Sequence, residues 1–345
     1  MPTPFDRTPR RLWHTLTLGL GLALASPATA LDLGIVTGSS AGTYIEIGRD
    51  IADTIAPEGL SLDVRESAGS LTNVYAVRYT PGVQLGLVQS DVLAFLRARA
   101  EGLVPEPLTP TERDQLSEMI ERIKLVHPLY IEEVHILAPR SIRSVEELAG
   151  RRVSFGRNGG GTFITAEQLF RTLDVPVVPI SDIAPLDAIE FMRAGEIDAM
   201  VYVVGQPASL FETLDLGEEF HFIPLNAPRL LQSYDPARIA RSSYPWLDTD
   251  IETVGVRSIL ISYDYKGREN CDAIGRLAEA IAANIDRLRR SGHPKWNAVA
   301  LDAEVAGWQR YACAGAAPQA TVPLADAPAP AGEPAPASFL DGFRR

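Results

Sequence analysis

A glycine-rich stretch in the middle of the chain has the composition of an anion-binding loop. The segment "RRVSFGRNGGGTFITAEQLF", residues 151–170, starts like a short strand, continues through three consecutive glycines and ends in a helical pattern. Backbone N–H groups at the start of a helix have no internal acceptor, and the helix dipole favours negative charge there. The stretch therefore predicts an anion site, with Thr162 as helix cap and further donor.

A second loop of small residues, "TGSSAGTY" at residues 37–44, stands in the same kind of context. Apolar residues alternate before it as in a strand and recur after it at helical spacing: Leu31, Leu33 and Ile35, then Ile47, Ile51 and Ile55. Thr43 supplies a hydroxyl here as Thr162 does in the other loop. One glycine loop is equally compatible with a simple tight turn, but two in equivalent places favour a shared binding role.

Neither loop fits a nucleotide site. Both lack the Lys of an ATP-type phosphate loop, and neither has the G-x-G-x-x-G spacing of a dinucleotide-binding fold. There is also no G-x-S-x-G or H-E-x-x-H motif. We therefore expect a binding protein rather than an enzyme, with no catalytic residue, no cofactor and no metal.

His135 and the neighbouring pair Glu132 and Glu133 are the one candidate metal site. Adjacent residues of a strand point to opposite faces, so these carboxylates would not converge on one ion. A structural role for His135 in the core is the favoured interpretation.

The order of elements indicates two α/β lobes. Each half runs strand, loop, helix, and later helix, strand, loop, which is typical of parallel sheets covered on both faces. Residues 134–138 form an apolar extended stretch between the halves, and "TVGVRSILISYDY" (residues 253–265) is a matching return, so two crossings form a hinge. We expect lobe 1 at 31–134 and 251–313, including an amphipathic helix over residues 274–288, and lobe 2 at 135–250.

The two ends of the chain have other signatures. Residues 1–30 combine arginines, an apolar run too short to span a membrane and an A-x-A pattern, which predicts a signal peptide cleaved after Ala30 and export to the periplasm. Residues 314–345 are rich in Ala and Pro and are expected to be a flexible tail. In an exported chain, Cys271 and Cys313 most simply form a disulfide; two buried free thiols are the alternative.

The net charge argues against some partners. Removal of residues 1–30, with three arginines and one aspartate, changes the net charge from −12 to −14. An acidic surface disfavours nucleic acid and anionic lipid, and no later segment resembles a transmembrane helix. Any membrane partner is therefore expected to be another protein, and the chain is expected to be a monomer.

Several motifs together resemble the TAXI family of solute-binding proteins, the extracytoplasmic receptors of TRAP transporters. They are "VTGSSAGTYIEIGRDIAD", "ESAGSLTNVYAV", "QLGLVQSDVLAF", "RVSFGRNGGGTFITAEQLF" and "HPKWNAVALDAEVAGWQRY", within residues 31–313. The resemblance implies a type II periplasmic-binding-protein fold and a small carboxylate ligand, such as glutamate or 2-oxoglutarate, that is passed to membrane permease subunits. The chain departs from the family at residues 38–44, where a glycine-richer opening such as GTGGTYY is common.

The resemblance also implies a set of ligand-binding residues, contributed by both lobes. They are Gly42, Thr43, Tyr44, Ser70, Asn73, Gln89 and Ser90 in lobe 1, and Asn158, Gly160, Gly161, Thr162 and Gly205 in lobe 2. Arg157 is added from the sequence itself, as a possible partner of a carboxylate, although an arginine in a loop is more often solvated. A periplasmic sensor that presents its solute to a receptor kinase is the alternative function, since its binding chemistry would be identical.

Overall fold

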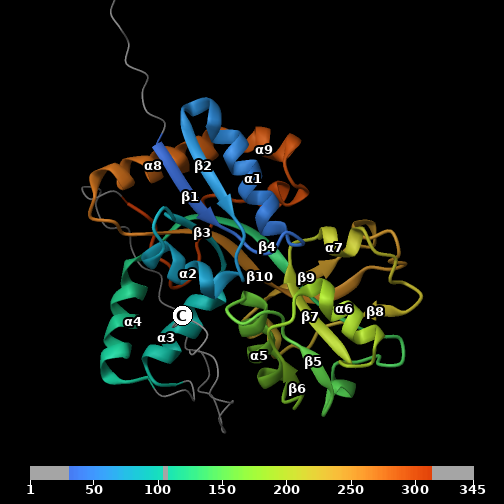
Figure 1. Ribbon diagram of the computed structural model, residues 1–345. Coiled ribbons are helices and arrows are strands. Elements are labelled where there is room, and N and C mark those ends of the chain that lie inside the picture. Colours follow the sequence, from blue (N-terminus) through green and yellow to red (C-terminus); the bar gives the residue numbers. More distant parts are fainter. Residues whose placement is uncertain (1–30, 104–107, 313–345) are drawn as a thin grey trace, which may run out of the picture.

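The computed structural model describes residues 31–103 and 108–312, shown in Figure 1. The predicted signal peptide with its cleavage site, and the predicted tail, lie outside this part. The strands of the described residues are β1 (Leu31–Val36), β2 (Leu60–Arg65), β3 (Leu85–Gln89), β4 (Ile123–Pro139), β5 (Arg152–Ser154), β6 (Val178–Ile180), β7 (Ala199–Val204), β8 (Phe220–Phe222), β9 (Asp235–Ile239) and β10 (Ile251–Tyr263).

Helices follow most of the strands. The α-helices are α1 (Thr43–Ile55), α2 (Ser70–Tyr79), α3 (Asp91–Ala100), α4 (Pro110–Arg122), α5 (Gly161–Leu173), α6 (Pro185–Arg193), α7 (Ser209–Glu212), α8 (Arg268–Ala283) and α9 (Ile285–Ser291). Short 3₁₀ helices are η1 (Ala56–Glu58), η2 (Glu146–Leu148), η3 (Leu230–Gln232), η4 (Arg241–Ser243) and η5 (Pro294–Ala298).

All described strands belong to one mixed sheet, in which eight follow the order β2-β1-β3-β10-β4-β7-β5-β6, while β8 pairs with β4 and β9 pairs with β10. At one end β2, β1 and β3 are parallel, and at the other β7, β5 and β6 are parallel. The long strands β4 and β10 join the two parallel groups and run antiparallel to each other and to β3 and β7. We call the part around β1–β3 with α1–α4, α8, α9 and η5 lobe 1, and the part around β5–β8 with α5–α7 lobe 2 (Figure 1).

The strands β4 and β10 are the two predicted crossings. The first half of β4 pairs with β10 beside β3, whereas residues 133–139 pair with β7 and β8 of lobe 2. The sequence predicts an extended crossing only over residues 134–138, so the observed strand is much longer. The reason is visible in its burial: almost every residue of β4 is buried, because helices or neighbouring strands cover it along its whole length.

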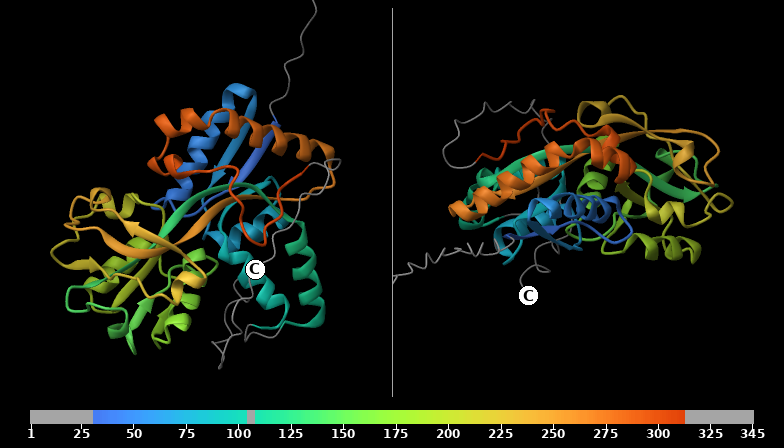
Figure 2. Two further views of the ribbon diagram at one scale, coloured as in Figure 1. Left: turned by 180° about the vertical axis from the view of Figure 1, so that it is seen from behind. Right: turned by 90° about the horizontal axis from the view of Figure 1, so that it is seen from above.

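Both faces of the sheet are covered, as expected for parallel strands (Figure 2). In lobe 1, Ile47 and Ile51 of α1 pack with Ile274 and Leu277 of α8 over one face. Residues of α2, α3 and α4 form a separate cluster over the other face. In lobe 2, α5 contributes to one apolar cluster, and α6 and α7 contribute to another. The helices α1, α2, α3, α5, α6 and α7 each follow a strand of one of the parallel groups and so start near the edge where that strand ends.

Some local predictions need correction. Thr162 does not cap α5: the N-cap is Gly160, and no side chain accepts a hydrogen bond there. The helix predicted over residues 274–288 is interrupted at Asn284, so it forms α8 and α9. The sequence reading also missed α4, which Thr109 and Glu112 start with a capping box.

In the described part of the chain, no helix combines the length and apolarity needed to cross a membrane. Cys271 is disulfide-bonded, as the sequence predicts. Its expected partner Cys313 lies outside the described residues, so the pairing itself stays a prediction.

Candidate functional site

A cavity of about 80 Å³ lies between the two lobes, where the glycine loops meet. Both lobes contribute to its wall. Its lining residues are Gly38, Ser39, Gly42, Thr43, Tyr44, Ala68, Gly69, Ser70, Gln89, Glu132, Gly156, Arg157, Gly160, Gly161, Thr162, Pro185, Tyr202, Val203 and Val204. Thr43 and Thr162, from the two predicted loops, thus lie on one cavity and not on remote surfaces.

Three helix N-termini open onto this cavity. The N-caps of α1, α2 and α5 are Gly42, Gly69 and Gly160, and none of the three helices has a side-chain cap. Each N-cap and the residue after it line the cavity. The first N–H groups of a helix lack intrahelical acceptors, so these termini bring N–H donors and positive dipole ends to one place. The arrangement suits a small anion.

The glycines at these termini allow the two lobes to touch. The N–H of Thr72 donates to the carbonyl of Gly159 at 3.0 Å, which links α2 to the loop before α5. A Cβ added to Gly161 would overlap the side-chain oxygen of Gln89, and one added to Gly69 would lie 3.2 Å from the Cα of Gly160. Larger residues at these positions would keep the lobes apart.

The two threonines use their hydroxyls to hold the walls in place. Thr43 Oγ1 donates to the carbonyl of Gly205 at 2.5 Å, a bond between the lobes. Thr162 Oγ1 accepts from the N–H of Val203 at 3.1 Å and so fixes α5 to β7. Thr165, one turn farther along α5, donates to Asp91 of lobe 1 at 2.8 Å. The cavity walls are therefore joined by several direct hydrogen bonds.

Glu132 is the acidic group of the cavity, and it comes from the crossing strand β4. Glu132 is only 2% exposed, and its Oε2 accepts a hydrogen bond from the Tyr44 hydroxyl at 2.7 Å. Burial raises the pKa of this carboxyl from 4.5 to about 8, because the charged form loses its hydration, while the Tyr44 hydrogen bond acts in the opposite direction. At neutral pH the empty site therefore favours the protonated acid.

Not every predicted ligand residue lines the cavity. The amide of Asn73 donates to the carbonyls of Thr37 and Leu87, at 2.5 and 2.7 Å, and so holds the ends of β1 and β3 together. Ser90 lies beyond Gln89 and donates its N–H to the carbonyl of Arg257. These two residues position the site from behind.

Two further predicted ligand residues, both in lobe 2, also do not line the cavity. Asn158 is partly buried within the loop before α5, and Gly205 contributes its carbonyl to the Thr43 hydrogen bond. Neither is among the residues that line the cavity. The remaining predicted residues do line it, including Arg157, which is an exposed residue.

The sequence reading missed Glu132 and Tyr202 as cavity residues. The sequence contained an indication for Glu132. Side chains along a strand point alternately to its two faces, so one of the adjacent glutamates Glu132 and Glu133 lies on each face. Tyr202 is the polar residue of the apolar segment "AMVYVV", and burial raises the pKa of its hydroxyl to about 12. Which face of each strand meets the other lobe depends on tertiary packing, which the sequence did not specify.

The comparison with known families agrees with this architecture. The sequence model of the NMT1-like family matches residues 35–308. This chain belongs to the NMT1-like family. The match begins in β1 and ends just beyond the last 3₁₀ helix, so it includes both lobes and every residue that lines the cavity.

One solved structure shows the same fold at low sequence identity, and two others are similar at a lower TM-score. A periplasmic transporter has a TM-score of 0.52 and 15% identity, over 81% of this chain and 91% of the other. An amino acid ABC transporter substrate-binding protein from Streptococcus pneumoniae, bound to L-arginine, has a TM-score of 0.42 and 13% identity, over 77% and 94%. The ligand-binding core of GluR0 in complex with L-glutamate has a TM-score of 0.42 and 13% identity, over 75% of this chain and 96% of the other. Together with the likeness to the periplasmic transporter, the two parallel strand groups joined by the crossings β4 and β10 give the NMT1-like chain the predicted type II periplasmic-binding-protein fold.

His135 is a structural residue of lobe 2, as predicted. It is fully buried, its Nδ1 lies 2.9 Å from the Glu133 carbonyl and its Nε2 lies 3.0 Å from the Tyr244 hydroxyl. Burial lowers the pKa of its imidazole to about 3, so the ring is neutral. Among the described residues, no group of His, Cys, Asp or Glu is arranged to hold a metal ion.

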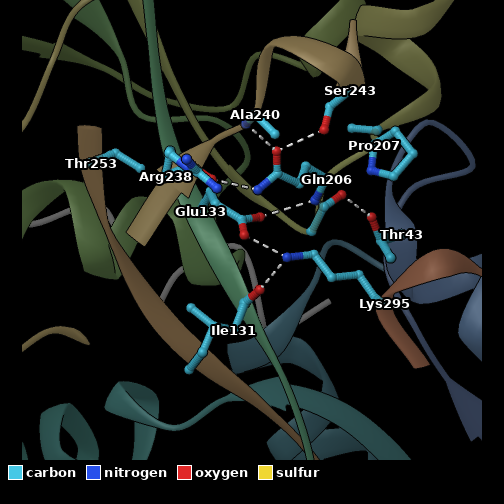
Figure 3. Close-up of polar contacts among 12 residues, drawn as sticks. Thr43, Ile131, Glu133, Gln206, Pro207, Arg238, Ala240, Ser243, Thr253 and Lys295 are labelled. Carbon is cyan, nitrogen blue, oxygen red and sulfur yellow. Dashed lines mark hydrogen bonds and ion pairs between the residues drawn. The ribbon is translucent and has the colours of Figure 1, made fainter. Parts of the chain in front are cut away.

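Behind the cavity, a second set of polar contacts joins the lobes (Figure 3). Glu133 points away from Glu132, and its Oε1 lies 2.5 Å from the Lys295 ammonium of η5. Its Oε2 accepts from the N–H of Gln206 in lobe 2 at 3.0 Å, and Lys295 also donates to the carbonyl of Ile131 at 2.7 Å. We call Glu133, Lys295 and Gln206 the interlobe latch.

The latch predicts a large effect of a single substitution. Lys295→Met should lower the free energy of unfolding by about 3–5 kcal/mol, because it leaves Glu133 buried without a cation. The double variant Lys295→Met with Glu133→Gln should recover a substantial part of that loss. Urea denaturation followed by circular dichroism measures both. Arg65→Met, which breaks the exposed ion pair with Asp63, is the control and should lower the free energy of unfolding by less than about 1 kcal/mol. An equal loss in Lys295→Met and Arg65→Met would contradict the role of burial.

Glu132 predicts a dependence of stability on pH. Because the folded state holds this proton to higher pH than the unfolded chain, unfolding releases it between pH 4.5 and about 8. The free energy of unfolding of the empty protein should therefore fall as the pH rises through that range, and Glu132→Gln should make the fall shallower. Asp91, with a pKa raised by burial from 3.8 to about 6, adds a slope of the same sign at lower pH. Urea titrations at a series of pH values measure the slope, and an unchanged slope in Glu132→Gln would count against a buried, protonated carboxyl.

Proposed function

We propose that this protein is the periplasmic solute-binding receptor of a TRAP-type secondary transporter. It captures a small carboxylate between its lobes and delivers it to the membrane permease subunits. The family motifs in the sequence support the transporter class, and the fold of a periplasmic transporter supports the location. The predicted signal peptide is consistent with that location.

The observation that carries the proposal is the convergence of three uncapped helix N-termini, from both lobes, on one cavity. A carboxylate that leaves water needs its hydrogen bonds replaced, and each charge-assisted bond contributes roughly 1.5–3 kcal/mol. Four to six such bonds are sufficient for micromolar affinity, about −8 kcal/mol, after the costs of association and closure. This affinity suits a carrier that must release its solute.

Closure of the lobes is part of the proposed mechanism. The solute docks on the N-termini of α1 and α2 in lobe 1, and lobe 2 then rotates about β4 and β10 to bring the terminus of α5 onto it. The hydrogen bond between Thr43 and Gly205 and the one between Thr165 and Asp91 form only when the lobes meet. The closed surface is then what the permease recognises.

The identity of the solute is tested by native mass spectrometry of freshly purified protein, followed by thermal shifts with mono- and dicarboxylates. We expect the purified protein to retain a small carboxylate. At least one carboxylate of the panel should raise the melting temperature of the protein, and this rise should increase with the concentration of that carboxylate. Turnover of the solute, or binding only of uncharged molecules, would contradict the proposal.

Gly161→Ala tests the closed form. The added methyl group would collide with Gln89 across the cleft, so the affinity for the retained solute should fall by roughly 100-fold in calorimetry, while the empty protein keeps its fold. Gly267→Ala is the matched control. The nearest atom to the added Cβ would lie 3.9 Å away, and Gly267, the N-cap of α8, does not line the cavity. Unchanged affinity in Gly161→Ala would place the solute elsewhere.

A further inference from the structure

The cavity combines an anion site with an acid that has no cationic partner. Glu132 is almost fully buried, and only one of its oxygens, Oε2, accepts a hydrogen bond from the described residues. The nearby ammonium of Lys295 is held by Glu133 on the other face of β4. Arg157 also lines the cavity, but it is an exposed residue and makes no ion pair with Glu132. The Oε1 atom of Glu132 is thus left for a group inside the cavity.

The charged and titratable groups around Glu132 do not supply that partner. They are Tyr44 on α1, Tyr130 and Glu133 on β4, Tyr202 on β7, Asp91 on α3 and Lys295 on η5. The tyrosines are neutral hydroxyls, and the two other acids disfavour a second negative charge. A carboxylate solute alone would keep Glu132 in its protonated form and would bring no charged partner to its free oxygen, whereas a cationic group on the solute can pair with the ionised acid.

We propose that Glu132, oriented by Tyr44, binds the protonated amino group of an α-amino acid whose carboxylate occupies the helix N-termini. The inference rests on the proposed function and narrows its ligand from small carboxylates in general to those that carry an amine. The positive end of such a zwitterion meets the acid of β4, and its negative end meets the amides of α1, α2 and α5. Both buried charges are then paired.

Binding of this solute has a proton balance. The amino group arrives as an ammonium ion, and Glu132 must be ionised to pair with it, so the proton of the empty site passes to solvent. Since the empty carboxyl has a pKa of about 8, up to about one proton is released for each solute bound near pH 7. An α-hydroxy acid of the same shape leaves Glu132 protonated and releases none.

The experiment uses pairs of amino and hydroxy acids that differ only in this group: L-glutamate and 2-hydroxyglutarate, L-aspartate and malate, L-alanine and lactate. Calorimetry of the mature protein in phosphate and in Tris measures affinity and proton release together. We expect the amino acid of at least one pair to bind about tenfold or more tighter than its hydroxy analogue, with proton release. Glu132→Gln should weaken that amino acid roughly 100-fold and its analogue by less than about threefold.

Two variants complete the test. Tyr44→Phe, which removes only the orienting hydrogen bond, should weaken the amino acid by about tenfold and provides a second reading if Glu132→Gln is poorly folded by circular dichroism. Glu118→Gln removes the same charge from the exposed surface of α4 and should change nothing. Hydroxy acids that bind as tightly as amino acids, or equal losses for both in Glu132→Gln, overturn the inference and leave the carboxylate receptor intact. If the protein neither retains nor binds any carboxylate, the proposed function fails, and the inference fails with it.

Discussion

The structure depends on three helix N-termini, whose first N–H groups have no acceptor within the helix and favour negative charge. The helices α1, α2 and α5 begin at glycines without a side-chain cap, and their first residues line one cavity. Glycine at the N-cap lets a ligand approach the main chain, and in the case of Gly161 the lack of a side chain also lets the opposite lobe come close. The same residue type therefore provides both the binding surface and the closure.

The crossing strands give this site its two faces. β4 carries Glu132 toward the cavity and Glu133 toward Lys295 and Gln206, because adjacent strand residues point in opposite directions. One glutamate thus belongs to the ligand site and its neighbour to the latch that holds the lobes. In the proposed closure, a rotation about β4 and β10 changes both environments at once and so couples occupancy of the cavity to the contacts behind it.

The acidic character of the chain does not conflict with an anionic ligand. Distant surface charges are screened beyond about 8 Å at physiological salt, so donors inside the cavity decide the local potential. Within the cavity, however, Glu132 is close enough to matter, and its burial makes its charge state depend on the solute. In the proposed complex, the amine of the solute pairs with this buried acid while its carboxylate meets the helix N-termini.

The sequence alone determined the elements around the two glycine loops and predicted a binding role for them. The alternation of Leu31, Leu33 and Ile35, and the glycine loops before Thr43 and Thr162, specify strand, loop and helix N-terminus, because these features depend on local backbone geometry. Only the tertiary structure decided which polar groups face the cleft. Asn73 turned out to brace β1 and β3, while Glu132 entered the cavity, since the orientation of a strand relative to the opposite lobe depends on contacts between residues far apart in the chain.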